Sequence, residues 1–387
     1  MKVIKISDLK VGSKYTKPLY LDKDSIFINA NTAVSEADIT RLNKFGFKEV
    51  LTQGELVQEM SASEMVLDTN TFPTNDHDFK MLQLKNIYLH IEKNVPAFET
   101  VFKDSFVVMQ ALFRKISEDK AFDINPVRDT ADKLVDQVRT NAHLCFCLIN
   151  HKPTGYYLYN QVVYATLFAL IIGSLLEYSR PKMVELAISG LLADIGMAKI
   201  PSVISEKNST LTDDEFKVIK KHPLFGYQIL TKVLKLKNAL GLVALQHHEN
   251  FDGSGYPQKI QKKEIDEFAR VFTIGDNFAA HILDRPWRKA LLPYEAMKNM
   301  ISLNTNKYDL GYIRLFLNKI AMYPIGSWVE LSDSSKAIVI DSNPNKPLRP
   351  SLMVVRNANG MKTKDSAFIN LSEEDKIYIT KAIPSDD

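Results

Sequence analysis

Cysteine is scarce in this sequence, because its 387 residues include two, Cys145 and Cys147. Their C-x-C spacing on a helix or strand makes neither a zinc knuckle nor a redox motif. We therefore expect two buried thiols and no disulfide framework. Reduced thiols are typical of proteins kept inside the cell, which favours a cytoplasmic location.

The sequence also lacks a secretory leader and a long apolar run. Its opening, MKVIKISDLKVG, holds no sustained apolar stretch, so we expect no signal peptide. The most apolar segment, 162–176, falls short of the roughly 20 apolar residues that a membrane-spanning helix needs. We therefore predict a buried core helix at this segment and no membrane span.

Neither sign of charge dominates. The net charge is +3, from 49 basic and 46 acidic residues, and the basic runs at 232–237 and 259–263 are short. Nucleic-acid-binding proteins usually carry a basic patch or stripe, so we expect no nucleic-acid partner. A composition that is 45% hydrophobic and 25% charged fits two or three folded domains.

Four regions follow one another along the chain. Residues 1–60 contain short strand-like runs and then a helical segment that Ser35 can cap, which predicts a small α/β module. Residues 61–119 are predicted to be a polar linker and a helical connecting segment. Helical spacing predicts an all-helical domain at 120–322, and alternation predicts a β-rich tail at 323–387. The expected fold class is mainly α.

Histidines and aspartates gather on apolar helical backgrounds within the third region. Asp194 lies in LLADIG, His222 in KKHPLFGYQIL, the pair His247 and His248 in QHHENFDGSGYP, and Asp276 in TIGDNFAA. A buried carboxylate needs a partner, and a cation is one solution. Imidazole and carboxylate together suit iron, manganese or zinc. A lone histidine is usually a satisfied side chain, but this set predicts a metal site.

The same segments resemble a known family. LTDDEFKVIKKHPLFGYQIL, HHENFDGSGYP and DRPWRK follow one another in the order and spacing typical of the HD-GYP branch of the HD phosphohydrolase superfamily. The resemblance covers roughly 155–325, and the tail is similar to the β-rich segment that often follows such domains. It implies an HD-type domain and hydrolysis of cyclic di-GMP by two or three clustered ions, often iron or manganese. Two ions about 4 Å apart can activate water and neutralise a phosphodiester.

The resemblance assigns five metal ligands, each at a position that keeps the family residue. Asp194 would bridge two ions, and His222 and His247 would complete the first of them. His248 matches a histidine that serves a third ion in some members. Asp276 matches the aspartate of the second ion.

Five other positions depart from the family pattern. Gln161 stands where the family has its first histidine, and Ala193 replaces the histidine of the HD pair. Met197 replaces a lysine thought to contact phosphate. Tyr157 and Ala279 stand at positions where the family has further carboxylates.

These departures lie on one side of the expected site. The first ion would keep Asp194, His222 and His247, whereas the second would keep carboxylates alone, with the Gln161 carbonyl as a weak substitute for imidazole. We therefore expect iron or manganese at reduced occupancy or absent. Removing one oriented electrostatic donor from an active site costs about 10²–10³ in rate. Phosphodiesterase activity is expected to be weak or absent, and whether the chain is an enzyme stays open.

The resemblance also implies nucleotide contacts. Tyr256 would stack on a guanine, and Arg285, Arg288 and Lys289 of DRPWRK would approach phosphate oxygens, for which arginine forks are suited. Surface charge at a helix end is the alternative interpretation of these basic residues.

The loop around Gly255, Tyr256 and Pro257 is implied to touch partner proteins such as diguanylate cyclase domains. A tight turn is the alternative explanation of its glycines, Gly253 and Gly255, which can adopt positive φ.

Three functions fit these observations. The first is a catalytically impaired protein that binds cyclic di-GMP or a signalling protein. The second is a residual metal-dependent cyclic di-GMP phosphodiesterase, and the third is a structural interaction protein with a vestigial site. The retained histidines favour the first two over the third, and the retained arginines favour the first over the third.

Overall fold

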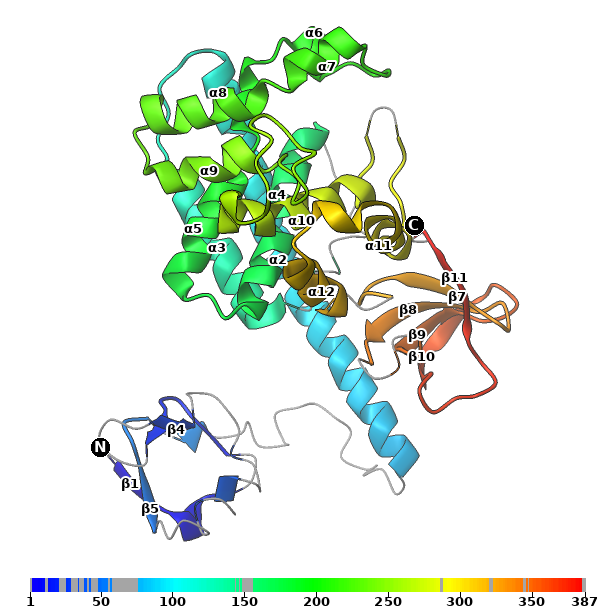
Figure 1. Ribbon diagram of the computed structural model, residues 1–387. Coiled ribbons are helices and arrows are strands. Elements are labelled where there is room, and N and C mark those ends of the chain that lie inside the picture. The colour runs from blue at the N-terminus through cyan, green and yellow to red at the C-terminus, as the bar shows by residue number, and fades with distance from the viewer. Residues whose placement is uncertain are drawn as a thin grey trace. The chain divides into compact units, whose positions relative to one another are not determined.

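The computed structural model is drawn in Figure 1 and divides into two compact units, Met1–Asp76 and His77–Asp387. The predicted linker at 61–75 lies outside the described residues. The structure describes residues 2–10, 13–20, 26–28, 34, 38–39, 42, 48–54, 56–57 and 76–384, except 143, 146, 148–155, 286–287, 320–322, 344–345 and 347.

The first unit is built on short antiparallel strands. Its four-stranded sheet has the order β1-β5-β3-β4, and β2 pairs with β6. Alternate side chains of β5 are buried, as expected for a sheet with one face on a core. The predicted strands of the small N-terminal module are confirmed, whereas the predicted cap Ser35 and most of the helical segment after it lie outside the described residues. The elements are β1 (Lys2–Lys5), η1 (Ile6–Asp8), β2 (Lys14–Tyr15), β3 (Leu19–Tyr20), β4 (Ile26–Ile28), β5 (Glu49–Thr52) and β6 (Leu56–Val57).

The second unit begins with helices. The predicted mainly α fold is confirmed, and η4 is a single π-helical turn that continues α8. The helices are α2 (Asp76–Ser117), α3 (Asn125–Asn141), α4 (Tyr157–Leu175), α5 (Arg180–Leu191), η3 (Ile195–Lys199), α6 (Ser202–Ser205), α7 (Asp213–Ile219), α8 (His222–Gln228), η4 (Ile229–Val233), α9 (Asn238–Gln246), η5 (Lys262–Glu264), α10 (Glu267–Ile282), α11 (Pro293–Asn304), η6 (Thr305–Lys307) and α12 (Leu310–Lys319).

Helix α4 is the centre of this unit. It is apolar on all sides and packs against α3, α5, α10 and α12, so the predicted core helix is confirmed. A Cβ on Gly275 would lie 2.5 Å from the Ala165 carbonyl oxygen, which shows how closely α10 approaches α4. By length and composition α4 could also cross a membrane, but 83% of its apolar window is buried inside the unit.

The segment around Asp194 differs from the prediction. Asp194 was expected on an apolar helical background, but α5 ends at Leu191 and Asp194 lies in the turn before η3. The reason is a tertiary contact, because a Cβ on Gly196 would lie 2.0 Å from the His222 carbonyl oxygen. This close approach of η3 to α8 brings Asp194 beside His222.

The chain ends in a five-stranded antiparallel sheet of order β10-β9-β8-β7-β11. Its β7–β8 turn contains Ser334 at φ +69°. Leu84 of α2 packs against Ile340 and Met353 of the sheet, and Figure 1 shows this sheet beside the part of α2 that extends from the helices. The strands are β7 (Trp328–Leu331), β8 (Lys336–Asp341), β9 (Ser351–Arg356), β10 (Lys362–Asn370) and β11 (Ile379–Ile383).

Candidate metal centre

Four of the five ligands predicted from the sequence come together. One potential ligand atom from each of Asp194, His222, His247 and His248 lies within 4.8 Å of all the others. Asp194 comes from the turn after α5, His222 is the first residue of α8, and His247 caps the C-terminal end of α9. Asp276 is not part of this group.

The two inner histidines, His222 and His247, each direct Nε2 toward Asp194. The Nδ1 of His222 lies 2.7 Å from the Ile219 carbonyl oxygen, and the Nδ1 of His247 lies 3.0 Å from that of Val243. A carbonyl oxygen only accepts, so each Nδ1 carries a proton, and each Nε2 faces the site, where it donates to Asp194 when it is protonated and offers a lone pair to a metal ion when it is not.

Three electron-pair donors therefore converge. The two Nε2 atoms lie 3.3 Å apart, and the Asp194 Oδ1 lies 3.2 Å from the Nε2 of His222 and 3.5 Å from that of His247. Such a set repels itself unless a cation or protons lie between the atoms. Backbone carbonyls behind metal-binding imidazoles are a usual second layer of a metal site. The residues present thus fit a divalent transition metal ion.

The electrostatics follow from the same contacts. Burial alone would raise the pKa of Asp194, but the hydrogen bonds from His222 and His247 hold that pKa well below its usual value. Burial would lower the pKa of His247, but the Asp194 carboxylate raises it above the ordinary value. Burial, and then the charges of His247 and His222, hold the pKa of His248 well below normal. His248 is therefore a neutral imidazole, which is the form that binds metals.

His248 lies between the inner histidines and the loop that follows His248 in the chain. Its ring is stacked on Tyr256, with centroids 4.8 Å apart and planes inclined by 27°. The Lys220 ammonium lies 5.1 Å from the centroid of the Tyr256 ring. The ring predicted to stack on a guanine thus already contacts an imidazole and a cation of its own chain.

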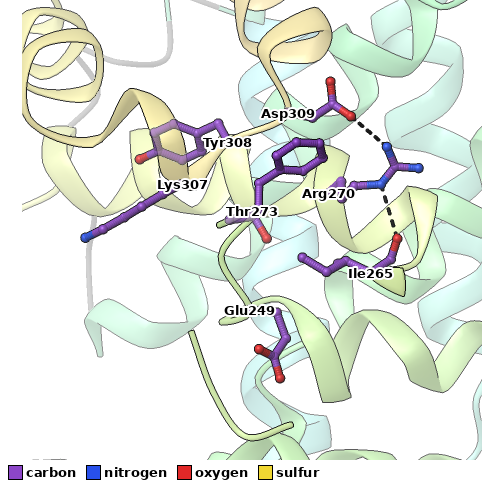
Figure 2. Close-up of a pocket in the computed structure, with 8 residues that line it drawn as sticks. Glu249, Ile265, Arg270, Thr273, Lys307, Tyr308 and Asp309 are labelled. Atoms are coloured by element: carbon purple, nitrogen blue, oxygen red, sulfur yellow. Dashed lines mark hydrogen bonds and ion pairs between the residues drawn. The ribbon is translucent and has the colours of Figure 1, made fainter. Parts of the chain in front are cut away.

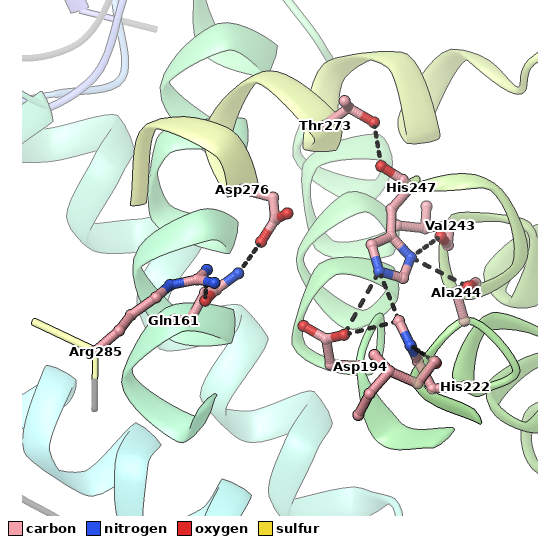
Figure 3. A network of polar contacts seen from close by, with 10 residues as sticks. Gln161, Asp194, His222, Val243, Ala244, His247, Thr273, Asp276 and Arg285 are labelled. Carbon is pink, nitrogen blue, oxygen red and sulfur yellow. Dashed lines mark hydrogen bonds and ion pairs between the residues drawn. The ribbon is translucent and has the colours of Figure 1, made fainter. Parts of the chain in front are cut away.

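Asp276 has a different environment from Asp194. It is 4% exposed, and its Oδ1 accepts a hydrogen bond of 2.7 Å from Nε2 of Gln161 on α4. The Oε1 of Gln161 accepts one of 2.6 Å from Nη2 of Arg285. Figure 3 shows Arg285 and Gln161 on one side of the two carboxylates and the inner histidines on the other.

The two carboxylates also influence each other. Burial and then the negative charge of Asp194 raise the pKa of Asp276, while His247, Gln161 and Arg285 act in the opposite direction. The Gln161 carbonyl, expected to be a weak metal ligand, is instead bonded to Arg285. The site therefore has two halves. Asp194, His222, His247 and His248 form the histidine half, and Gln161, Asp276 and Arg285 form the arginine half.

The other departures from the family pattern are apolar or face elsewhere. Ala193 and Ala279 are fully buried, and Met197 is 8% exposed in the helical core. Lys199, two residues beyond Met197, does not replace the family lysine, because it donates to the Ile116 carbonyl oxygen at 2.8 Å, at the end of α2. The Tyr157 ring lies 5.7 Å from the Arg285 guanidinium carbon. None of these five side chains adds a ligand to the histidine half.

The remaining basic residues of DRPWRK have separate environments. Arg288 donates to the carbonyl oxygens of Ala280, His281 and Lys289, and so stabilises the C-terminal end of α10. The Lys289 side chain is 93% exposed, and its Nζ lies 3.7 Å from Oδ2 of Asp284. Of the three basic residues predicted to contact nucleotide, only Arg285 is bonded to the network around Asp276.

The loop after His248 is fixed by a close backbone approach at Gly255 and by hydrogen bonds to Glu249. Gly253 has φ +81°, as expected, whereas Gly255 is required for space, because a Cβ there would lie 2.4 Å from the Asn250 amide nitrogen. Glu249 accepts hydrogen bonds from the amides of Gln258 and Lys259 at 2.5 and 3.0 Å. Pro257 is exposed.

A small cavity lies beneath this loop and is drawn in Figure 2. Its volume of about 10 Å³ suffices for at most one water molecule, so it is no nucleotide pocket. In the described part of the chain, Glu249 Oε2 is buried without a hydrogen-bond partner, which fits a bridging water there. Arg270 closes one side through a 2.6 Å ion pair with Asp309.

Sequence reasoning missed the groups that orient the ligands. Thr273 donates to the His247 carbonyl oxygen at 2.8 Å, and the Ala244 carbonyl lies 3.1 Å from Nδ1 of His247. The position of His247 directly after an apolar helix is a local signal for such a cap. The bond from Arg285 to Gln161 joins residues 124 positions apart, and no local signal reports it.

Comparison with known proteins gives two family matches. Residues 144–311 match the HD domain family, and residues 328–387 match a KOW domain associated with HD domains.

Two curated relatives carry related names. Cyclic di-GMP phosphodiesterase PA4108 of Pseudomonas aeruginosa is 26% identical over 328 residues, which cover 84% of this chain and 77% of that protein. Cyclic di-GMP phosphodiesterase PdeB of Borreliella burgdorferi is 33% identical over 188 residues, 48% of this chain and 49% of that protein. The chain thus matches about half the length of the second relative.

Among solved structures, Bd1817, a HDG"Y"P protein from Bdellovibrio bacteriovorus, superposes with a TM-score of 0.48 at 16% identity. The superposition covers 81% of this chain and 97% of that one.

Proposed function

Because the chain belongs to the HD-GYP family of HD-domain proteins, we propose that it is a degenerate member that binds cyclic di-GMP and hydrolyses it slowly or not at all. The relatives named as cyclic di-GMP phosphodiesterases support the ligand class. The observation that carries the impairment is the Gln161–Arg285 pair, which supplies Asp276 with one hydrogen bond and a nearby positive charge but no imidazole.

The proposal includes one divalent ion, iron or manganese, held by Asp194, His222 and His247, with His248 beside them. A carboxylate and several imidazoles are donors that suit these metals. A bound ion would polarise a phosphodiester oxygen and lower the pKa of a bound water. With Ala193 and Gln161 in place of imidazoles, a second ion lacks nitrogen ligands, so its contribution to rate is lost.

Arg285 is the residue of the chain that we assign to the phosphate groups. Its guanidinium carries a permanent positive charge at the Asp276 side of the site, and arginine suits phosphate oxygens. Arg288 and Lys289 are not part of this assignment, because Arg288 binds backbone carbonyls and Lys289 is largely solvated.

Residual hydrolysis is the second candidate. It is supported by the three donors Asp194, His222 and His247, whose two imidazole rings are oriented by backbone carbonyls. A protein partner, such as a diguanylate cyclase domain at the exposed Pro257 loop, is compatible with either function. A purely structural role would need neither the donors nor the nucleotide.

Calorimetry with cyclic di-GMP and protein loaded with one equivalent of manganese tests the proposal, together with chromatography for the linear product. We expect saturable binding that weakens on Arg285→Met, and turnover about 10²–10³ below that of an intact relative assayed in parallel. Arg288→Met is the matched control and should bind like the parent protein. Turnover equal to the intact relative would contradict the impairment, and absent binding would favour the structural role.

A further inference from the structure

Asp276 needs a positive partner that its direct neighbour cannot supply. The carboxylate is 4% exposed, and burying an uncompensated charge costs several kcal/mol. Its 2.7 Å hydrogen bond comes from the Gln161 amide, which is neutral. The nearest charge along this chain of bonds is Arg285, which donates to the other end of the same amide at 2.6 Å. The amide dipole thus lies aligned between cation and anion, and this alignment strengthens both bonds.

Arg285 is held in this position from two directions. Tyr157 and Gln161 are four residues apart on α4, so they share one helix face, and both contact the guanidinium. The backbone of Arg285 exchanges hydrogen bonds of 2.8 and 3.1 Å with that of Arg288, which fixes the loop after α10. The packing against Tyr157 and the hydrogen bond to Gln161 thus both hold the Arg285 guanidinium near Asp276.

We propose that Arg285 takes the place of a second metal ion in this site and limits it to one divalent cation. This inference rests on the metal centre of the proposed function. One dication at the histidines and the guanidinium at Asp276 already carry one positive charge more than the two buried carboxylates offset, so no negative charge is left for a second dication. A second dication would meet like charge at close range, where repulsion in a partly buried site amounts to several kcal/mol. It would also find one Asp276 oxygen and the Gln161 carbonyl already bonded.

Manganese stoichiometry tests this directly, by calorimetry on metal-free protein and by elemental analysis after gel filtration. The parent protein should bind one ion per chain. Arg285→Met should bind two, the second more weakly. Adding Gln161→His to Arg285→Met should tighten the second ion by about 10-fold or more, since it supplies an imidazole. Arg285→Lys keeps the charge and should stay at one ion.

Arg288→Met is the matched control, because it removes a guanidinium from the same loop that binds only backbone carbonyls. It should stay at one ion. If Arg285→Met does not fold, Arg285→Gln keeps a hydrogen-bonding side chain without charge and should also bind two. Two ions in the parent protein, or one in a folded charge-free variant, would overturn the proposal. A parent protein that binds no ion would instead reject the metal centre itself.

Discussion

The two buried carboxylates of the site are compensated in different ways. Asp194 faces two imidazoles whose outer nitrogens are bonded to helix carbonyls a few residues away. Asp276 is compensated across the fold, through an amide on α4 and a guanidinium from the loop after α10. An imidazole can lose its proton and bind a metal, whereas a guanidinium keeps its charge at all relevant pH values. Only the histidine half can exchange its protons for a metal ion.

The largest expected effect separates the two carboxylates. Asp194→Asn should weaken manganese binding by more than about 100-fold, because even groups behind metal ligands contribute 10–100-fold. Asp276→Asn should weaken the same binding by about 10-fold or less, since Arg285 already offsets its charge. Calorimetry on both variants measures this difference. Equal losses would show that the two halves act as one binuclear site.

The second effect is on stability and isolates the arginine half. Gln161→Leu removes both hydrogen bonds and leaves two charged groups without their shared partner, so unfolding should be easier by about 3 kcal/mol. Manganese affinity should change by about 3-fold or less. Urea unfolding and calorimetry check the two quantities. Gln258→Leu, at an exposed side chain, is the control and should stay within about 0.5 kcal/mol.

The smallest effect comes from a charge cluster outside both halves. Burial would raise the pKa of Glu267, but hydrogen bonds from Tyr178 and Lys182 lower it below the usual value. A depressed carboxyl pKa stabilises the fold above the unfolded-state pKa, and this stabilisation is lost as pH falls through the folded-state pKa. Glu267→Gln should therefore cost about 0.5–1 kcal/mol at pH 7, for a half-exposed group, and less below pH 4. Thermal unfolding at both pH values measures this, and a cost that grows in acid would contradict the assignment.

Much of the fold follows from local patterns. The run at 162–176 is apolar on every side, so any folded arrangement must enclose it, and α4 is the resulting core helix. Alternation predicted a β-rich tail at 323–387, and within it β7 pairs with β8. The end of α5 was not predictable, since it depends on how closely Gly196 approaches α8.

The sequence by itself determined the mainly α fold and the set of histidines and aspartates that can bind a metal. These depend on spacing within a helix or a short block, which local residues control. Only the tertiary structure decided which positively charged group compensates which carboxylate. Gln161, Asp276 and Arg285 meet because α4 packs against α10, and the direction of each hydrogen bond depends on that packing rather than on any neighbour in sequence.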